Sequence, residues 1–279
     1  MVSIQQFSIG PVRLGVGSPL FLIAGPCVIE SAGHCFFMAR ELKSISDRAG
    51  VPLVFKASFD KANRTSLESF RGPGLEEGLK ILNAVRNDLN LPVLTDVHDV
   101  SQVVPAAQVV DCLQIPAFLS RQTDLVLAVG QSGCAVNIKK GKFLSPWDMR
   151  HVLDKVASTG NSRILLTERG TSFGYNNLVV DMRSFPIMHD FGYPVVFDVT
   201  HSLQLPGGQG TASGGQPQFI EYLARAGVGA GVDGVFMEVH DNPAVALSDG
   251  SNALPLDRLE RLLQTLKKVH EIVRVQERS

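Results

Sequence analysis

The sequence predicts a single (β/α)8 barrel preceded by a short β-hairpin. Short apolar runs alternate with longer amphipathic stretches about eight times, the runs are continuously apolar, and polar residues gather where they end. Continuous hydrophobicity is typical of parallel strands buried on both faces. A chain of 279 residues is of ordinary size for one such barrel. An open doubly wound sheet is the alternative that the alternation also permits.

Eight runs rich in Val, Ile, Leu and Phe are interpreted as the barrel strands. They span residues 20–28, 52–59, 92–97, 112–118, 135–140, 163–169, 194–201 and 234–240. Amphipathic stretches between them predict helices, and the Ser-Pro-Trp-Asp sequence at 145–148 has the capping pattern of a helix start. Residues 1–18 are expected to form the hairpin extension. No linker or repeat interrupts the pattern, so we expect one domain over residues 1–279.

Composition and charge exclude several classes of protein. Lys and Arg number 26 against 27 for Asp and Glu, so no global field favours nucleic acid or an anionic membrane. The N-terminus lacks the basic start and apolar run of a signal peptide, and no stretch reaches the roughly 18 apolar residues of a membrane span. The four cysteines lack C-x-x-C spacing, which argues against a disulfide framework or a zinc ribbon. We expect a soluble, cytoplasmic protein that binds neither nucleic acid nor membrane.

Cationic residues cluster at the ends of several predicted strands. Lys56 and Lys139 lie inside strands, where an unpaired buried ammonium is costly. With Lys61, Arg64 and Arg169 they would face the end of the barrel where active sites are found. So many cations indicate a ligand with several negative charges, and phosphate and carboxylate groups are the natural partners. Ser58, Thr65 and Ser66 could add hydroxyl donors, whereas Lys140 and Lys142 are interpreted as residues of solvated loops.

Four residues have the chemistry of metal ligands: Cys27, His201, Glu238 and Asp249. The first three close predicted strands one, seven and eight, which are neighbours in a closed barrel, and Asp249 follows strand eight. A thiolate, an imidazole and two carboxylates suit Zn²⁺, Fe²⁺, Mn²⁺ or Co²⁺ better than Mg²⁺ or Ca²⁺. Because a lone cysteine in a strand is more often a small core residue, spacing alone makes this a weak prediction.

Other features carry less specific predictions. The glycine-rich residues 205–215 follow neither the dinucleotide nor the Walker pattern, and we expect a mobile loop over the barrel mouth. His34 falls in a helical stretch and is interpreted as a surface or packing residue. His98 and His240 end strands and could support the residues of a site.

Ten motifs, in order and along nearly the whole chain, resemble the 3-deoxy-D-manno-octulosonate 8-phosphate synthases. They are AGPCVIES, FKASFDKANRTS, RGPG, TDVH, QIPAFLSRQTDL, NIKKGKFLSPWDM, TERGTSFGYNNLVVDMR, DVTHSLQLPGG, SGG and ALSDGSNALPL. The related 3-deoxy-D-arabino-heptulosonate 7-phosphate synthases share the barrel and the Gly-Pro-Cys start, but KANRTS and DVTHSLQ favour the octulosonate branch.

The resemblance implies a (β/α)8 enzyme that condenses phosphoenolpyruvate with arabinose 5-phosphate and water, giving an eight-carbon keto-sugar phosphate for the lipopolysaccharide inner core and free phosphate. It implies that Lys61, Lys139 and Arg169 hold phosphoenolpyruvate, with Lys56 near the reacting groups. It places Asn63, Arg64, Thr65 and Ser66 on arabinose 5-phosphate, and Arg121 on its phosphate from a neighbouring subunit of a homotetramer. Ser58, Asp96, Gln114 and Phe118 complete the expected binding set, and Lys56, Lys61, His201 and Asp249 are the expected catalytic residues.

The same family contains a metal-dependent class with cysteine on the first strand and a metal-independent class with asparagine there. Cys27 and the matching His201, Glu238 and Asp249 therefore imply a four-ligand site for a divalent ion. Whether the ion orients the aldehyde or activates the water is left open. Two other functions also stay open: a heptulosonate 7-phosphate synthase that uses erythrose 4-phosphate, and a non-catalytic barrel that binds phosphosugars.

Overall fold

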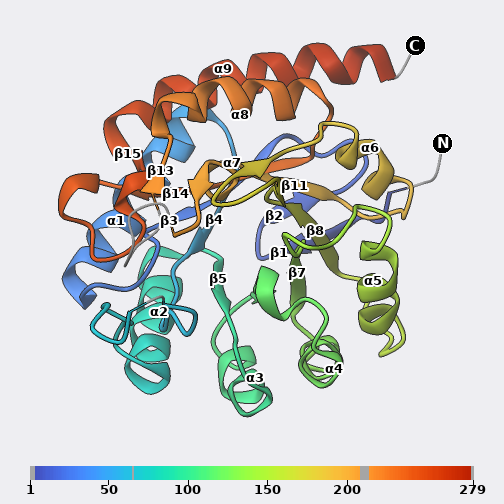
Figure 1. The fold of residues 1–279 in the computed structure, drawn as a ribbon. Helices are drawn as coiled ribbons and strands as arrows, with labels where there is room; N and C mark the ends of the chain where they lie inside the picture. The colour runs from blue at the N-terminus through green and yellow to red at the C-terminus, as the bar shows by residue number, and fades with distance from the viewer. Residues whose placement is uncertain (1–3, 65, 208–213, 278–279) are drawn as a thin grey trace.

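The computed structural model describes residues 4–64, 66–207 and 214–277, and it confirms the predicted barrel (Figure 1). The barrel strands are β3 (Phe21–Gly25), β4 (Leu53–Lys56), β5 (Val93–Asp96), β6 (Cys112–Ile115), β7 (Ala135–Lys139), β8 (Ile164–Glu168), β11 (Val195–Asp198) and β14 (Gly234–His240). Each lies within one of the predicted runs. All pair in parallel, in the order β11-β8-β7-β6-β5-β4-β3-β14, and β11 also pairs with β14. This last pairing closes the sheet, so the open doubly wound alternative is wrong.

Helices surround the barrel on its outside (Figure 1). They are α1 (Ala32–Ala49), α2 (Leu75–Leu89), α3 (Val100–Ala107), α4 (Thr123–Gln131), α5 (Met149–Ala157), α6 (Ser184–His189), α8 (Ile220–Gly229) and α9 (Leu256–Glu277). The single turn α7 (Val199–Ser202) instead follows β11 directly and carries His201 at the C-terminal end of the barrel. The 3-10 turns are η1 (Ala117–Leu119), η2 (Pro217–Phe219), η3 (Pro243–Val245) and η4 (Gly250–Asn252). No helix in the described ranges is both long and apolar enough to cross a membrane.

The helix start predicted at residues 145–148 is partly wrong. The expected capping bonds form, because Ser145 N–H donates to Asp148 Oδ2 and Asp148 N–H donates to Ser145 Oγ. The residues between them form a turn, however, and α5 begins only at Met149. A capping pattern therefore identified the helix but not its first residue.

The N-terminal hairpin consists of β1 (Phe7–Ile9) and β2 (Val12–Leu14), which pair antiparallel as predicted. Ile9, Val12 and Leu14 are almost fully buried and join a cluster with one or two side chains from each of the eight barrel strands. The hairpin thus packs onto the apolar end of the barrel interior. A larger apolar core fills the space between the strands and the helices.

The inner face of the barrel changes from apolar to polar along each strand. Val54 and Leu94 belong to the apolar interior cluster, and Lys56 and Asp96 follow them two residues later. Because alternate residues of a strand share a face, these later side chains also point inward. Counting two residues on from the apolar residue of each strand except β3, and four in the case of Lys139, gives a layer of buried polar side chains. These are Lys56, Asp96, Gln114, Asn137, Lys139, Thr167, Asp198 and Glu238. The barrel interior is therefore apolar toward the N-terminal ends of the strands and forms a charged chamber at their C-terminal ends.

Short strands in the loops extend this end of the barrel. The pairs are β9 (Thr171–Ser172) with β10 (Leu178–Val179), β12 (Gln204–Leu205) with β13 (Gly214–Gly215), and β15 (Leu254–Pro255) with the end of β14. Most of the glycine-rich segment, which we expected to be a mobile loop, lies outside the described residues.

Candidate active site

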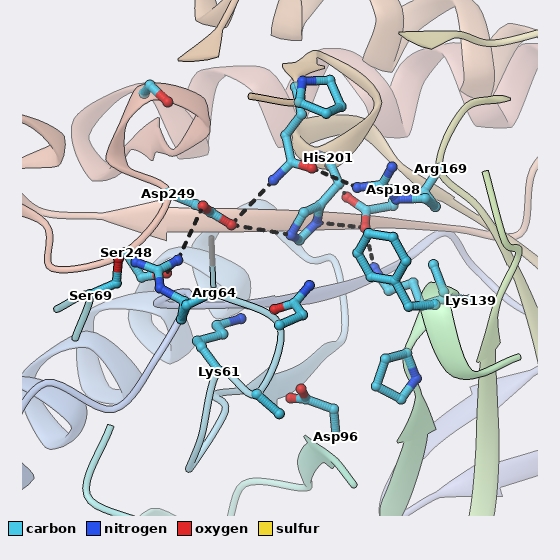
Figure 2. A pocket seen from close by; sticks show the side chains of 18 of the residues that line it. Lys61, Arg64, Ser69, Asp96, Lys139, Arg169, Asp198, His201, Ser248 and Asp249 are labelled. Atoms are coloured by element: carbon cyan, nitrogen blue, oxygen red, sulfur yellow. Dashed lines mark hydrogen bonds and ion pairs between the residues drawn. The ribbon is translucent and has the colours of Figure 1, made fainter. Parts of the chain in front are cut away.

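The C-terminal ends of the strands enclose a cavity of about 610 Å³. Figure 2 shows charged side chains that converge on it from several strands and loops. The sequence-predicted residues that line it are Lys56, Lys61, Asn63, Arg64, Asp96, Gln114, Phe118, Lys139, Arg169, His201 and Asp249. Residues far apart in the sequence are thus brought to one chamber, as the strand-end pattern predicted.

Several predicted residues do not line the cavity. Ser58 is fully buried and donates its hydroxyl proton to Asp96 Oδ1, so it supports a lining residue rather than facing the chamber. Ser66 is half-buried and Arg121 is exposed, both outside the lining of this single chain. Thr65 lies outside the described residues.

The four predicted metal ligands come together beside the chamber. One donor atom each from Cys27, Glu238 and Asp249 lies within 4.8 Å of the other two. Cys27 Sγ is 3.6 Å from Asp249 Oδ2. His201 Nε2 lies 3.4 Å from Glu238 Oε1 and 4.0 Å from Asp249 Oδ2. Cys27, Glu238 and Asp249 are thus close enough to share one divalent ion, and His201 lies next to two of them.

A close approach of two strands supports this corner. A Cβ on Gly25 would lie 1.8 Å from the carbonyl oxygen of Lys56, so only glycine permits β3 and β4 to lie so near each other here. Just beyond, Lys56 Nζ donates to the carbonyl oxygen of Cys27 at 2.9 Å. The cysteine and the lysine are therefore fixed relative to each other.

The donor chemistry fits a borderline ion. Glu238 Oε2 is buried and has no hydrogen-bond partner among the described residues. Burial, and next the charge of Glu238, raise the pKa of the Cys27 thiol well above its ordinary value. A thiol in this position needs a metal to become a thiolate, and coordination deprotonates such a group outright. An orphan carboxylate oxygen beside a buried thiol is what a metal ligand set without its ion would show.

His201 is oriented by Asp198, which the sequence-based site set did not include. Asp198 Oδ2 accepts from His201 Nδ1 at 2.7 Å and also contacts the ammonium of Lys139. Figure 2 shows His201 between Asp198 and Asp249. A carboxylate on one imidazole nitrogen leaves the other nitrogen free as a lone pair, which is the usual support for a metal-binding histidine. Burial alone would raise the pKa of Asp198, but the charges of His201 and Lys139 hold it far below its ordinary value.

Lys56 and Lys61 both face Glu238, with Nζ atoms 3.4 and 3.7 Å from Oε1. Burial would raise the pKa of Glu238, but His201 and these two lysines lower it to about 2. Lys139 lies over the ring of Phe236 at 3.3 Å, and burial lowers its pKa to about 8 against the opposing charge of Asp198. These lysines therefore have carboxylate partners before any ligand binds.

Arg169 is different, because it has no carboxylate within ion-pair distance in the described part of the chain. It is 7% exposed, its Nη2 donates to Gln204 Oε1 at 2.7 Å, and its Nη1 has no described partner. Lys142 also lines the cavity, lies over the ring of Phe118 at 4.6 Å, and has its pKa lowered to about 8 by burial and then by Arg169. A buried arginine that lowers the pKa of a neighbouring lysine forms with it a ready site for an anion.

A second cationic position lies across the chamber from Arg169 (Figure 2). Arg64 Nη1 is 3.0 Å from Ser248 Oγ and 3.8 Å from Asp249 Oδ1. Ser248 Oγ also lies 2.9 Å from Cys27 Sγ. Arg64 therefore links the loop after β4 to the loop that carries the candidate metal ligand Asp249.

Sequence reasoning missed or misjudged several residues of the chamber. Lys142 was expected on a solvated loop but lines the cavity, and Lys140 was expected there too but is fully buried and 3.4 Å from Glu168. Asp198, Gln204 and Ser248 were not proposed as site residues. Asp198 had a usable signal, since it ends a strand three residues before His201. The contacts of Ser248 and Gln204 depend on the conformations of loops, which residue spacing does not predict.

A (β/α)8 barrel with a cationic chamber at its C-terminal end is the architecture of a class of enzymes that act on anionic substrates. The chain belongs to the DAHP synthetase I family, whose model it matches over residues 1–275. It is 60% identical to the 2-dehydro-3-deoxyphosphooctonate aldolase of Trichlorobacter lovleyi over 270 residues, which cover 97% of this chain and 99% of that protein. Proteins of the same name from Geobacter metallireducens and Geobacter sulfurreducens are 59% and 58% identical, with the same coverage. That name denotes a 3-deoxy-D-manno-octulosonate 8-phosphate synthase. The relatives thus confirm the predicted resemblance and support this branch over the heptulosonate one.

Proposed function

We propose that this chain condenses phosphoenolpyruvate with arabinose 5-phosphate and water to give 3-deoxy-D-manno-octulosonate 8-phosphate and free phosphate. The observation that carries the proposal is Arg169, a buried guanidinium without a described carboxylate partner, in a chamber that Lys139 and Lys142 also line. A buried cation is costly unless it is paired. The phosphate and carboxylate of phosphoenolpyruvate would supply the missing negative charges.

Residues on opposite sides of the chamber would bind different substrates. Arg169 and Lys139 would bind phosphoenolpyruvate on one side of the chamber, and Arg64 would meet the phosphate of arabinose 5-phosphate on the other. Asp96, which accepts from His98 Nε2 at 2.9 Å, lies on the wall between them and could accept a sugar hydroxyl. Holding both substrates in one chamber would place C3 of the enol phosphate against the sugar aldehyde, and such positioning is a large part of catalysis.

The proposed reaction forms a C–C bond from C3 of phosphoenolpyruvate to the aldehyde carbon while water adds at C2. The hemiketal phosphate then breaks its C2–O bond and releases phosphate. Fixed cations that face the developing charge stabilise such steps without reorganisation. Lys61 suits this role, because burial would lower its pKa but the thiolate form of Cys27 and the charge of Glu238 raise it well above the usual value, so it stays positive. Lys139, with a pKa of about 8, can also give a proton to the departing phosphate.

We further propose that Cys27, His201, Glu238 and Asp249 hold a divalent ion such as Zn²⁺, Fe²⁺, Mn²⁺ or Co²⁺. The orphan Glu238 Oε2 and the buried thiol of Cys27 support this proposal. The bound ion would supply Lewis acidity, either at the aldehyde oxygen or at the attacking water.

Phosphate release with two sugars tests the proposed reaction. We expect rapid release with arabinose 5-phosphate and phosphoenolpyruvate, and much slower release with erythrose 4-phosphate, because Arg64 and Asp96 would meet the phosphate and hydroxyls of a sugar of fixed length. Steady-state kcat/KM for each sugar is the measurement. Comparable values would reassign the chain to heptulosonate synthesis, and tight binding without release would indicate a non-catalytic phosphosugar barrel.

We also propose a homotetramer in which Arg121 of one subunit reaches the sugar phosphate of the next. The exposure of Arg121 outside the lining of the single chain is consistent with this role. Analytical ultracentrifugation should give the mass of four chains. Arg121→Ala should raise the KM for arabinose 5-phosphate about tenfold or more, the cost of one charge-assisted hydrogen bond, and leave the KM for phosphoenolpyruvate unchanged. A monomer with an unaltered KM for the sugar would contradict the proposal.

A further inference from the structure

A second group of metal-binding side chains lies outside the chamber. Glu30 follows β3, His34 is in the first turn of α1, His240 ends β14 and Asp241 comes directly after it. None of them lines the cavity. We propose that Glu30, His34 and His240 form a second divalent-metal site, supported by Asp241 and independent of the Cys27 group and of the proposed reaction.

The three ligand atoms are already close together. One donor atom each from Glu30, His34 and His240 lies within 4.8 Å of the other two. His240 Nε2 is 3.2 Å from Glu30 Oε1, and His34 Nδ1 is 4.0 Å from Glu30 Oε2. The two imidazole rings lie side by side with centroids 4.7 Å apart and planes at 37°. A small contraction would bring all three onto one ion.

The opposite edges of both rings face one carboxylate oxygen. Asp241 Oδ1 is 3.0 Å from His34 Nε2 and 3.1 Å from His240 Nδ1. A histidine that binds a metal usually gives its other N–H to such a carboxylate, which fixes the tautomer. With both protons on the Asp241 edge, His34 Nδ1 and His240 Nε2 present lone pairs to the carboxylate of Glu30. In this pair of tautomers, a cation between the three acceptors would replace the hydrogen bond that His240 Nε2 can otherwise donate to Glu30 Oε1.

Two further observations fit this arrangement, and a third shows which hydrogen bond metal binding would change. His34 Nδ1 is buried and has no hydrogen-bond partner in the described residues. Glu30 Oε1 accepts from Leu247 N at 2.8 Å, which leaves Oε2 for an ion. In the metal-free protein Asn242 N donates to His240 Nδ1 at 3.0 Å, so His240 then carries its proton on Nε2, toward Glu30. Metal binding would require that proton on Nδ1, where Asp241 Oδ1 at 3.1 Å would accept the hydrogen bond in place of the one from Asn242 N.

The chemistry of the group indicates which ion it takes. Two imidazoles and one carboxylate are the donors of zinc sites that keep a fourth position open for water. Glu30 and Asp241 bring two negative charges to a region where the side chains of Glu30, His34 and His240 are only 16%, 17% and 6% exposed. With neutral imidazoles, one Zn²⁺ or Co²⁺ balances those charges.

The test is the number of Zn²⁺ ions bound per chain. Protein stripped with dipicolinate is titrated with Zn²⁺ in competition with a chromophoric chelator. We expect two sites in the native chain, one in Cys27→Ala, and one in either His34→Ala or His34→Gln. Asp241→Asn should keep both sites but weaken the second about 10- to 100-fold, the usual effect of removing a supporting carboxylate.

His151→Ala is the matched control, because His151 is an exposed histidine on α5, and it should keep two sites. Co²⁺ gives an independent readout, since only the Cys27 group can produce a thiolate-to-metal absorption band. That band should survive in His34→Ala and vanish in Cys27→Ala. A native chain that binds one Zn²⁺, or a His34→Gln chain that still binds two, overturns the second site. Either result leaves the Cys27 group and the proposed reaction untouched.

Discussion

Treatment with dipicolinate is expected to abolish phosphate release, and Zn²⁺, Mn²⁺ or Co²⁺ is expected to restore it. An ion held by Cys27, His201 and the two carboxylates would stabilise charge at the reacting oxygen by several kcal/mol. About 4 kcal/mol corresponds to a roughly thousandfold loss of kcat when the ion is removed. The measurement is kcat at saturating substrates, before and after metal is returned. His34→Ala is the best background, because its metal content reports the Cys27 group alone.

The Cys27→Asn variant tests whether metal affinity and catalytic activity are lost together. An amide is a poor ligand for a borderline ion, so metal affinity should fall steeply. The resemblance to a family with an asparagine class predicts that some activity persists. Full turnover by a native chain that elemental analysis shows to be metal-free would refute the metal-dependent reaction. Cys27 would then be a small buried core residue.

Arg169→Ala is expected to weaken phosphoenolpyruvate binding about 10²- to 10³-fold, because truncating one partner of a buried charge pair costs roughly 2–5 kcal/mol. The guanidinium is buried, with one nitrogen unpaired among the described residues, so no internal ion pair is lost with it. Isothermal titration of the free enzyme with phosphoenolpyruvate gives the dissociation constant directly.

Two variants make this result interpretable. Arg163→Ala removes an exposed arginine just before β8, at the opposite end of the strand from Arg169, and should bind normally. Arg169→Lys keeps the charge but loses the planar fork, so its affinity should lie between the native and alanine values. Equal dissociation constants for native and Arg169→Ala chains, with both folded by circular dichroism, would remove Arg169 from the site.

The strands and the chamber were predictable because burial leaves a strong sequence pattern. Strands covered on both faces must be continuously apolar, and a lysine inside such a strand, as at Lys56 or Lys139, must point to something charged. Lys140 shows the limit of that reasoning. It follows Lys139 directly at the end of β7, yet its ammonium turns away to Leu144 O and Thr171 Oγ1, because successive residues of an extended chain face opposite sides.

Contacts between residues far apart in the sequence were not predictable from spacing. The rings of His34 and His240 lie 4.7 Å apart although about 200 residues separate them, and the sequence pattern placed His34 only on a helix. Asp198 could have been found from its strand-end position beside His201. The partners of Ser248 could not, because they depend on how the loop after β14 folds back over Cys27.

The closed strand order ties metal retention to the completion of folding. Cys27 follows β3, the first barrel strand of the chain, whereas Glu238 lies on β14, the last, and these two strands pair side by side. A growing polypeptide leaves the ribosome with Cys27 long before His201, Glu238 or Asp249 exists. When the unfolded chain lacks a metal site, the free energy of metal binding adds to the free energy of folding. An ion held by these four residues would therefore stabilise the contact between the first and the last barrel strands to be synthesised.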